Sequence, residues 1–577
     1  MFSRVVSGTI YGLQGFLVEV EVDFSQGLPC FVMVGSLKSE VKESAERVRI
    51  ALKNNKITIP PMHIAVNLSP ADIKKSGTGF DLPVAVGVLC SMGLFDEEKI
   101  KDTLILGELG LNGEIKRVNG VMPIVWEAKR QGITKCIVPV GNSDEALLVP
   151  GVEVLGASDI NQVLAYLNAE ETDKELIIPT LTPRHINGND EKITLDFDEV
   201  KGQENIKRGA LIAVSGNHHM LIMGPPGTGK TMIARRIPTI LPPMTEEECM
   251  EVTSIYSIAG KLTDDRPVIR MRPFVSPHHT VSPAGLVGGG AIPMPGAISL
   301  AHKGVLFLDE LPEFHRNSID LLREPLEEKK INISRAAGAF VYPADIMLVA
   351  AMNPCPCGYY PDTNKCNCTP WAIKQYVSNI SGPILDRIDL CLTVNKVKIK
   401  DLDSDGEKND ENLDSDGEKN DESSNKTEKY RVGVARNMRD VENVERKMGK
   451  LENTERYLEN LKKANHKDMN AKGNVMNTET MLKRVLITRD IQKERFKNEH
   501  ISCNSQMGIR EIEKFCLLSP GDKSRVEDIC DKMDISVRGY HRLLRVSRTI
   551  ADIEESDSIR LEHVMEAIGY RPQILGN

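Results

Sequence analysis

Apolar and polar residues alternate along much of the first third of the chain, as they do in strands with one buried face. Other stretches there have apolar residues three or four positions apart, the spacing of a helix that packs on a sheet. The strands predicted from this pattern lie at residues 16–22, 31–34, 62–68 and 136–139, and the helices at residues 40–54, 82–92 and 160–167. We therefore expect a mixed α/β domain over residues 1–168.

A second α/β block is predicted at residues 196–396, after a polar, proline-containing linker at residues 169–195. Short apolar runs alternate there with helical segments, which is typical of a parallel sheet covered on both faces. Its buried strands are expected at residues 220–223, 305–308 and 346–350. Residues 479–577 have helical spacing throughout and are expected to form a small helical domain.

Residues 397–478, between these two blocks, have too few apolar positions to build a core. The ten residues LDSDGEKNDE at 402–411 recur letter for letter at 413–422. Residues 401–428 contain twelve acidic residues and three lysines, so this stretch alone carries the net charge of −9 that the whole chain has. The rest of the chain is neutral, and its charge does not argue against a DNA-binding face.

Neither a secretion signal nor a run of roughly 18 to 20 apolar residues, the length of a membrane span, is found in the sequence. The chain has 12 cysteines, which without a secretion signal are expected to be reduced thiols or metal ligands. We therefore expect a cytoplasmic protein with no membrane partner.

A phosphate-binding loop is predicted where the apolar strand at 220–223 meets a helix. The sequence GPPGTGKT matches G-x-x-x-x-G-K-[ST], whose glycines let backbone N–H groups surround phosphate oxygens. Lys230 is expected to reach the phosphates of ATP, and the Thr231 hydroxyl to bind Mg²⁺. The residues of this loop are Gly224, Pro225, Pro226, Gly227, Thr228, Gly229, Lys230 and Thr231.

Polar residues follow two further predicted strands. Asp309 and Glu310 end the strand at 305–308, and Asn353 follows the strand at 346–351. The ends of parallel strands face one crevice, so Asp309 can hold the metal and Glu310 can polarise water. Asn353 could orient that water, although an Asn-Pro pair is equally typical of a turn.

Arg387 and four cysteines have two interpretations each. Arg387 lies between Asp386 and Asp389 and is either a surface ion pair or an arginine finger that contacts the ATP of a neighbouring subunit. The pattern C-x-C-x₈-C-x-C suits tetrahedral Zn²⁺, and the alternative is four separate reduced thiols. Its four cysteines are Cys355, Cys357, Cys366 and Cys368.

Several longer strings resemble the Mg-chelatase-like AAA+ proteins of the YifB/ComM type. They are RPFVSPHHT at 272–280, LVGGG at 286–290, PGAISLAH at 295–302, LFLDELPEF at 306–314, AAMNPCPCG at 350–358, SGPILDRIDL at 381–390 and SVRGYHRLLR at 536–545. The resemblance implies an α/β multidomain protein with a Lon-protease-like N-terminal domain, an AAA+ core with a parallel sheet, and a C-terminal helical lid.

The resemblance also implies roles for single residues. Asn353 is similar to sensor 1, Arg387 to the arginine finger, and Arg538 to the sensor-2 arginine of the lid, with Arg542 as the alternative. A finger from the next subunit implies a homo-oligomeric ring, expected to be a hexamer. Residues 273–299 and 331–343 resemble hairpins that point at the substrate.

The Lon-type resemblance of the first domain does not extend to proteolysis. The position of the serine nucleophile falls at Gly79 and that of the lysine at Met122, while Ser76 and Lys116 are nearby but not aligned with those places. We therefore expect a binding domain without protease activity.

Three functions are compatible with an ATP- and Mg²⁺-dependent ring motor of this kind. The resemblance favours a ComM-like helicase that promotes branch migration when imported DNA recombines. A basic cluster near the C-terminus, Arg538, Arg542, Arg545 and Arg548, is the local argument for DNA. The alternatives are a Mg-chelatase motor subunit and a protein-remodelling chaperone.

Overall fold

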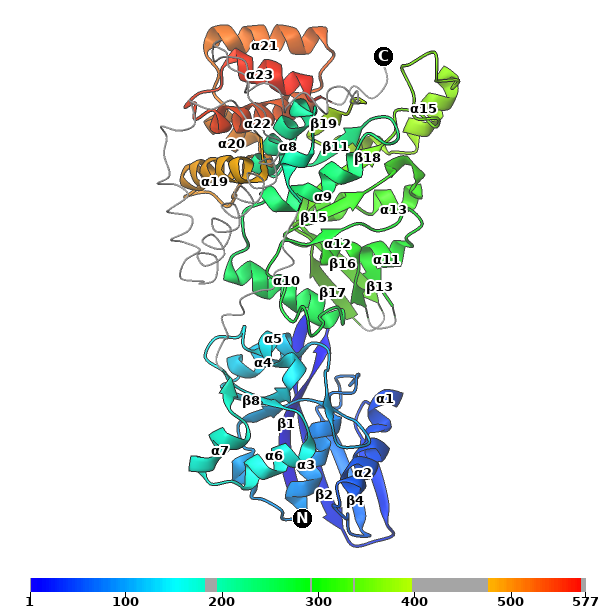
Figure 1. Ribbon diagram of the computed structural model, residues 1–577, viewed down its shortest axis with the longest axis vertical. Helices are drawn as coiled ribbons and strands as arrows, with labels where there is room; N and C mark the ends of the chain where they lie inside the picture. The colour runs from blue at the N-terminus through cyan, green and yellow to red at the C-terminus, as the bar shows by residue number, and fades with distance from the viewer. Residues whose placement is uncertain (1, 182–194, 291–292, 336–337, 397–475, 572–577) are drawn as a thin grey trace, which may run out of the picture.

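The computed structural model describes residues 2–181, 195–290, 293–335, 338–396 and 476–571. Figure 1 shows three parts: a mixed sheet with its helices, a parallel sheet with its helices, and a group of C-terminal helices beside the second sheet. Most of the acidic segment predicted at residues 397–478 lies outside the described residues.

The N-terminal part is built on an eight-stranded mixed sheet in the order β10-β9-β8-β5-β1-β2-β4-β3. Its strands are β1 (Phe2–Tyr11), β2 (Gln14–Ser25), β3 (Cys30–Val34), β4 (His63–Ser69), β5 (Thr103–Ile105), β8 (Lys135–Pro139), β9 (Glu153–Ala157) and β10 (Thr180–Leu181). A short pair, β6 (Glu108–Leu109) and β7 (Ile115–Lys116), lies outside this sheet.

Two expectations for this part need correction. Residues 169–195 are not wholly a linker, because α7 (Glu171–Ile177) lies there and β10 pairs with β9 at the edge of the sheet. The helix expected at 40–54 is two helices that meet at Glu43, α1 (Ser39–Lys42) and α2 (Ser44–Asn54). The other helices are α3 (Asp81–Ser91), α4 (Val121–Arg130), α5 (Ser143–Ala146) and α6 (Ile160–Asn168).

The second part has a five-stranded parallel sheet in the order β12-β15-β18-β11-β19. Its central strands are buried along their whole length, which explains their continuous apolar sequence. The strands are β11 (Met220–Met223), β12 (Phe274–Val275), β15 (Val305–Leu308), β18 (Met347–Met352) and β19 (Leu390–Thr393).

Helices and two antiparallel pairs surround this parallel sheet (Figure 1). The helices are α8 (Glu204–Gly216), α9 (Lys230–Ile240), α10 (Glu246–Ile258), α11 (Pro283–Val287), α12 (Ala297–Leu300), α13 (Arg316–Asp320), α14 (Arg323–Glu328), α15 (Pro370–Ser378) and α16 (Gly382–Leu385). The pairs are β13 (Gly288–Gly289) with β14 (Met294–Pro295), and β16 (Lys330–Arg335) with β17 (Gly338–Pro343).

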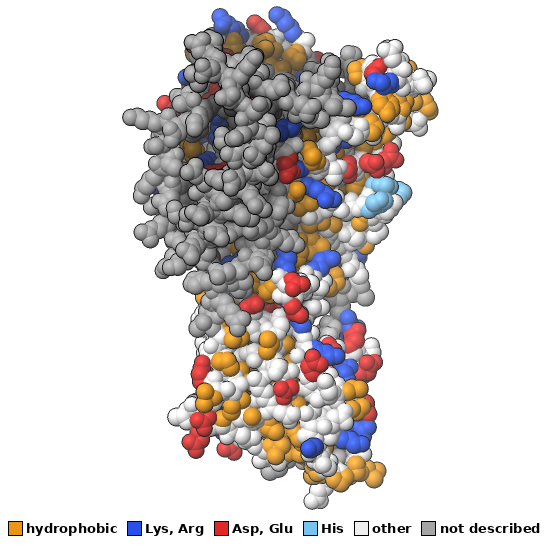
Figure 2. All heavy atoms as spheres, in the orientation of Figure 1, with side chains coloured by type: hydrophobic (Ala, Val, Ile, Leu, Met, Phe, Trp, Pro, Cys, Tyr) orange, Lys and Arg blue, Asp and Glu red, His pale blue; other side chains and the backbone are white. Residues whose placement is uncertain are grey.

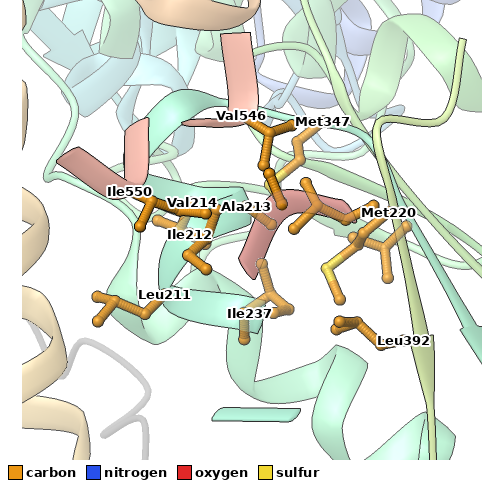
Figure 3. Close-up of a cluster of buried hydrophobic side chains, with 14 of the residues drawn as sticks. Leu211, Ile212, Ala213, Val214, Met220, Ile237, Met347, Leu392, Val546 and Ile550 are labelled. Atoms are coloured by element: carbon orange, nitrogen blue, oxygen red, sulfur yellow. The ribbon is translucent and has the colours of Figure 1, made fainter. Parts of the chain in front are cut away.

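The C-terminal helices share one core with the parallel sheet. Val546 and Ile550 lie among side chains of α8, including Val214, and this cluster continues to Met347 of β18 (Figure 3). Burial of this apolar surface holds the helices against the sheet. The helices are α19 (Thr478–Arg495), α20 (Ile509–Phe515), α21 (Pro520–Lys532), α22 (Val537–Ile553) and α23 (Leu561–Gly569).

The N-terminal part contacts the second part through a buried polar junction. The Ser257 hydroxyl at the end of α10 donates to Glu145 Oε2 at 2.6 Å and accepts from the Gly120 amide at 2.9 Å. The ring of Tyr11 also lies 4.7 Å from that of Phe340 in β17. On the face in Figure 2, acidic and basic side chains are interspersed over the N-terminal part. Among the described helices, none is both long and apolar enough to cross a membrane.

Candidate active site

Three neighbouring strands of the parallel sheet bring the predicted site residues to one edge. β18 pairs with β15 on one side and with β11 on the other, all in parallel. The loop after β11, the carboxylates after β15 and Asn353 after β18 therefore leave the sheet at the same end. They line one cavity of about 270 Å³, whose walls are residues 226–231, Asp309, Glu310, Met352 and Asn353.

The glycines of the loop after β11 have backbone conformations, or lie so close to neighbouring atoms, that larger residues could not replace them. Gly227 has φ +75° and Gly229 has φ +84°, both left-handed. A Cβ on Gly224 would lie 2.5 Å from the Val394 carbonyl oxygen. Helix α9 begins at Lys230, so this loop directs the N–H groups of a helix N-terminus into the cavity.

Lys230 and Thr231 each contact a residue from a different strand end. The Lys230 ammonium donates to Asn353 Oδ1 at 3.0 Å and to the carbonyls of Gly224 and Pro225 at 2.8 and 3.0 Å. The Thr231 hydroxyl donates to Asp309 Oδ2 at 2.8 Å. Burial lowers the pKa of Lys230, and the carboxylates of Asp309 and Glu310 oppose that shift.

Glu310 contacts a histidine that the sequence did not single out for this role. Its backbone is left-handed, with φ +52°, and its amide donates to Asp309 Oδ1 at 3.0 Å. Glu310 Oε2 lies 3.5 Å from His279 Nδ1, from the segment before α11. The adjacent His278 bonds instead to the Thr280 hydroxyl, so the two histidines have different partners.

The predicted arginines lie in a different cavity, of about 390 Å³, which shares none of its lining residues with the first. Arg387 contacts Glu327 of α14 and donates to the Pro383 carbonyl at 2.5 Å. Arg538 of α22 lies 3.6 Å from the same Glu327 oxygen. Arg538, which resembles a sensor-2 arginine, therefore lies in the cavity of Arg387 and not among the residues that line the phosphate-loop cavity.

The other arginines of the basic cluster have partners within the chain. Arg542 donates to the carbonyls of Leu385 and Ile388 at 3.0 and 2.9 Å, and so holds the turn that carries Arg387. Arg548 is buried and bonds to Asp552. These two side chains therefore support the fold and do not form a DNA-binding patch.

Sequence comparisons agree with this arrangement. Family models described as "Magnesium chelatase, subunit ChlI", "Subunit ChlI of Mg-chelatase" and "Magnesium chelatase, subunit ChlI C-terminal" match residues 196–402, 20–142 and 475–571. Competence protein ComM of Haemophilus influenzae is 36% identical over 570 residues, which are 99% of this chain and 97% of that protein. The chain belongs to the Mg-chelatase-like YifB/ComM family.

Two other relatives place this family membership in context. The uncharacterized protein YifB of Salmonella typhimurium is 36% identical over 555 residues, 96% of this chain and 94% of its own. Lon protease 2 of Bacillus subtilis is 29% identical over 148 residues, 24% of this chain and 26% of its own. Membership in this AAA+ family supports ATP binding and ATPase activity.

The cavity between the strand ends fits the Mg²⁺ nucleotide that the family implies. A hydroxyl and a carboxylate 2.8 Å apart are the hard oxygen ligands that Mg²⁺ prefers. The glycine loop, which turns backbone N–H groups inward, suits phosphate oxygens. Thr231 and Asp309 would hold the metal, and residues 224–231 the phosphates.

A second feature of this YifB/ComM-type chain is a four-cysteine cluster after Asn353. The four Sγ atoms lie within 4.8 Å of one another, an arrangement that could hold a metal ion. The Sγ–Sγ distances are 3.3 Å for Cys355–Cys357, 3.5 Å for Cys357–Cys366 and 3.7 Å for Cys355–Cys366. Tetrahedral Zn–S bonds of about 2.3 Å place the sulfurs about 3.8 Å apart, so the cluster fits zinc.

Gly79 and Met122, the positions at which the resemblance places the Lon-type serine and lysine, both lie in the N-terminal part. A Cβ on Gly79 would face Val118, three residues before α4. Met122 is buried and its amide donates to Glu145, the carboxylate bound by Ser257 of α10. Burial raises the pKa of Glu145 against its hydrogen bonds from Ser257 and Asn142. Helix α10 therefore packs against the start of α4, where Met122 lies.

Proposed function

We propose that this chain is a Mg²⁺-dependent ATP hydrolase that assembles into a hexameric ring and moves on DNA as a branch-migration helicase. The observation that supports hydrolysis most directly is the shared cavity, in which Lys230, Asp309 and Glu310 come from two strand ends. The near full-length similarity to a competence protein supports the DNA role.

The residues of this cavity have complementary roles in the proposed reaction. Lys230 binds phosphate oxygens, and Thr231 and Asp309 hold the metal. Glu310 accepts a hydrogen bond from the attacking water and polarises it. Asn353 orients that water and also accepts a hydrogen bond from Lys230. Bound Mg²⁺ supplies charge neutralisation on the phosphates.

Arg387 and Arg538 are proposed to act on the nucleotide of the next subunit. Their cavity is separate from the phosphate loop of their own chain, so neither completes that site internally. The two arginines line a surface cavity and can instead face the phosphate-loop cavity of a neighbouring subunit. Hydrolysis would then require a ring. Loss of an arginine finger lowers turnover by about 10³- to 10⁵-fold in other phosphate-transferring systems.

The contact with DNA is assigned to the hairpin β16–β17 and to the segment around β13–β14. Lys330 and Arg335 belong to β16 and are exposed, as a phosphate-contacting hairpin requires. The N-terminal part is proposed to be a Lon-type binding domain without protease activity, since Gly79 and Met122 replace the dyad. The domains proposed from the sequence are 1–168, 196–396 and 479–577, with the helix and strand at 171–181 added to the first.

The four-cysteine cluster is proposed to hold a structural Zn²⁺. All four ligands are thiols, which favour zinc over Mg²⁺. Metal analysis of the purified chain tests this: about one zinc per chain is expected, and a chain isolated under reducing conditions without zinc would contradict it.

The DNA role is tested by ATPase measurements with single-stranded, duplex and four-way DNA at low salt. Stimulation that is strongest with the branched substrate is expected, and it should decrease as salt rises because phosphate contacts release counterions. The Glu310→Gln variant should bind DNA in the presence of ATP without turnover, with Glu313→Gln as a matched control. ATPase activity unaffected by any DNA, with no DNA binding below about 100 mM salt, would contradict the proposal.

A further inference from the structure

The loop that carries the cysteine cluster touches the phosphate loop directly. Gly358 follows Cys357 and has φ +85°, a left-handed backbone. A Cβ on Gly358 would lie 2.5 and 2.8 Å from Cδ and Cγ of Pro226, which lines the ATP cavity. Only a residue without a side chain allows this approach, so the cysteine loop packs tightly on Pro226.

The same loop also carries Asn353. This residue lies two positions before Cys355 and accepts a hydrogen bond from Lys230. The Cβ position of Gly358 is 3.8 Å from Asn353 Cγ. The turn at residues 353–358 therefore contacts the phosphate loop at two places, through Lys230 and through Pro226.

Interactions around the sulfur atoms fix the shape of this turn. The Gly358 amide donates to the Cys355 carbonyl at 2.9 Å, and the Tyr360 amide donates to Cys355 Sγ at 3.4 Å. Cys355 is buried, whereas Cys357, Cys366 and Cys368 are only half-buried. Apolar packing around these three is limited, and a bound metal would supply most of the rigidity.

We propose that the metal held by the four cysteines braces the phosphate loop through the contact between Gly358 and Pro226, so that metal occupancy sets nucleotide affinity. The inference rests on the proposed zinc and ATP sites. Without metal, the turn at 353–358 samples other conformations, and ordering it again on nucleotide binding reduces affinity. Because the zinc is structural, its removal is expected to weaken nucleotide binding before it affects hydrolysis.

Two variants and one matched control distinguish the effect of the metal from the effect of the contact between Gly358 and Pro226. Cys366→Ser with Cys368→Ser removes two ligands, and Gly358→Ala leaves all four ligands but strains the backbone and collides with Pro226. Cys30→Ser removes one exposed thiol outside the cluster. Zinc content by mass spectrometry and affinity for a fluorescent ATP analogue are measured on each full-length chain.

The double cysteine variant should lose zinc, and its affinity for nucleotide should fall by about ten-fold or more. A loss of this size corresponds to the free-energy cost of one strained residue. Gly358→Ala should keep zinc and lose a similar factor of affinity, while Cys30→Ser should change neither. Circular dichroism melting checks the fold of each. Stripping zinc from the unaltered chain with a chelator and then restoring it gives the same comparison without a substitution.

Each contrary outcome identifies what has failed. Unchanged nucleotide affinity after zinc is stripped, or in folded Gly358→Ala, overturns the brace and leaves both proposed sites standing. Zinc missing from the unaltered chain overturns the metal site, and the brace with it. An unaltered chain that holds zinc but does not bind the nucleotide overturns the ATP site.

Discussion

The two cavities of the ATPase part differ in how their charged groups are paired. In the phosphate-loop cavity, the ammonium of Lys230 bonds to neutral oxygens, and the Asp309 and Glu310 carboxylates lie free of any lysine or arginine ion pair within the described residues. In the arginine cavity, Arg387 and Arg538 share the carboxylate of Glu327. The first arrangement is ready for a metal nucleotide, whereas the second balances its own charges.

We propose that the first cavity is sufficient for nucleotide binding and that the second is needed for turnover. A site that holds nucleotide by itself and receives its arginines from outside makes hydrolysis depend on assembly.

Arg387→Ala is expected to have the largest effect. Turnover should fall about 10³-fold or more, because the arginine stabilises charge that develops only in the transition state. Affinity for the ATP analogue should stay the same, since Arg387 lies outside the phosphate-loop cavity. Steady-state ATPase and equilibrium binding measure the two effects.

Mixing experiments show whether Arg387 acts across an interface. Rings that combine Arg387→Ala with Glu310→Gln subunits contain interfaces with both native residues, so part of the activity should return. Arg130→Ala, an exposed arginine of the N-terminal part, is the control. Equal activity of the mixture and of the separate variants would contradict action in trans.

A smaller, pH-dependent effect is expected at His219, which lines the arginine cavity. Burial lowers the pKa of His219 to about 4; Asp389 and Asp345 oppose this, while His218 and Arg545 add to it. Its Nδ1 accepts the Leu348 amide at 3.1 Å, which requires the neutral ring. Below about pH 6.5 the unfolded chain binds a proton that the folded chain does not, so stability falls as pH decreases towards 4.

The size of this loss is about 2 kcal/mol between pH 7 and pH 5. His219→Asn, which keeps an acceptor near the Leu348 amide, should remove most of it, and His500→Gln on the surface should not. Urea unfolding at the two pH values measures the difference. Asp389 does not interfere, because Arg545 and His218 outweigh its burial and lower its pKa to about 2. The contribution of Asp389 to stability is therefore lost only below the range from pH 7 to pH 5.

The two cavities also differ in how far they could be predicted from the sequence. The glycine loop directly follows β11 and the carboxylates directly follow β15, so each is visible within a short segment of sequence. The parallel order of β11, β15 and β18 then brings them together. Arg387 was found by its motif, but its pairing with Glu327 depends on how α14 packs. The contact between Arg538 and Glu327 has the same origin, since the docking of α22 is decided by contacts far apart in sequence.

Other residues were missed for similar reasons. His279 is one of two adjacent histidines in the string RPFVSPHHT, and only the fold places it beside Glu310. Gly358 is only the last residue of the string AAMNPCPCG in the sequence, and its contact with Pro226 joins the loops that follow two different strands. In the N-terminal part, β10 was taken for linker because two residues are too few to show an alternating pattern.

The smallest expected effect concerns Glu327, whose carboxylate pairs with both arginines. If this ion pair keeps Arg387 within its own subunit before assembly, Glu327→Gln should favour assembly. In that variant no ion pair has to break before Arg387 can contact the neighbouring subunit. A half-exposed pair contributes about 0.2–1 kcal/mol, so the protein concentration for half-maximal ATPase should fall by about 1.5- to 5-fold. Maximal turnover at saturating protein should not change. Glu328→Gln on the same helix is the control, and the difference should shrink in high salt. A half-maximal concentration that is the same in both variants would mean that Glu327 is only a surface ion pair, and that assembly is governed elsewhere in the interface.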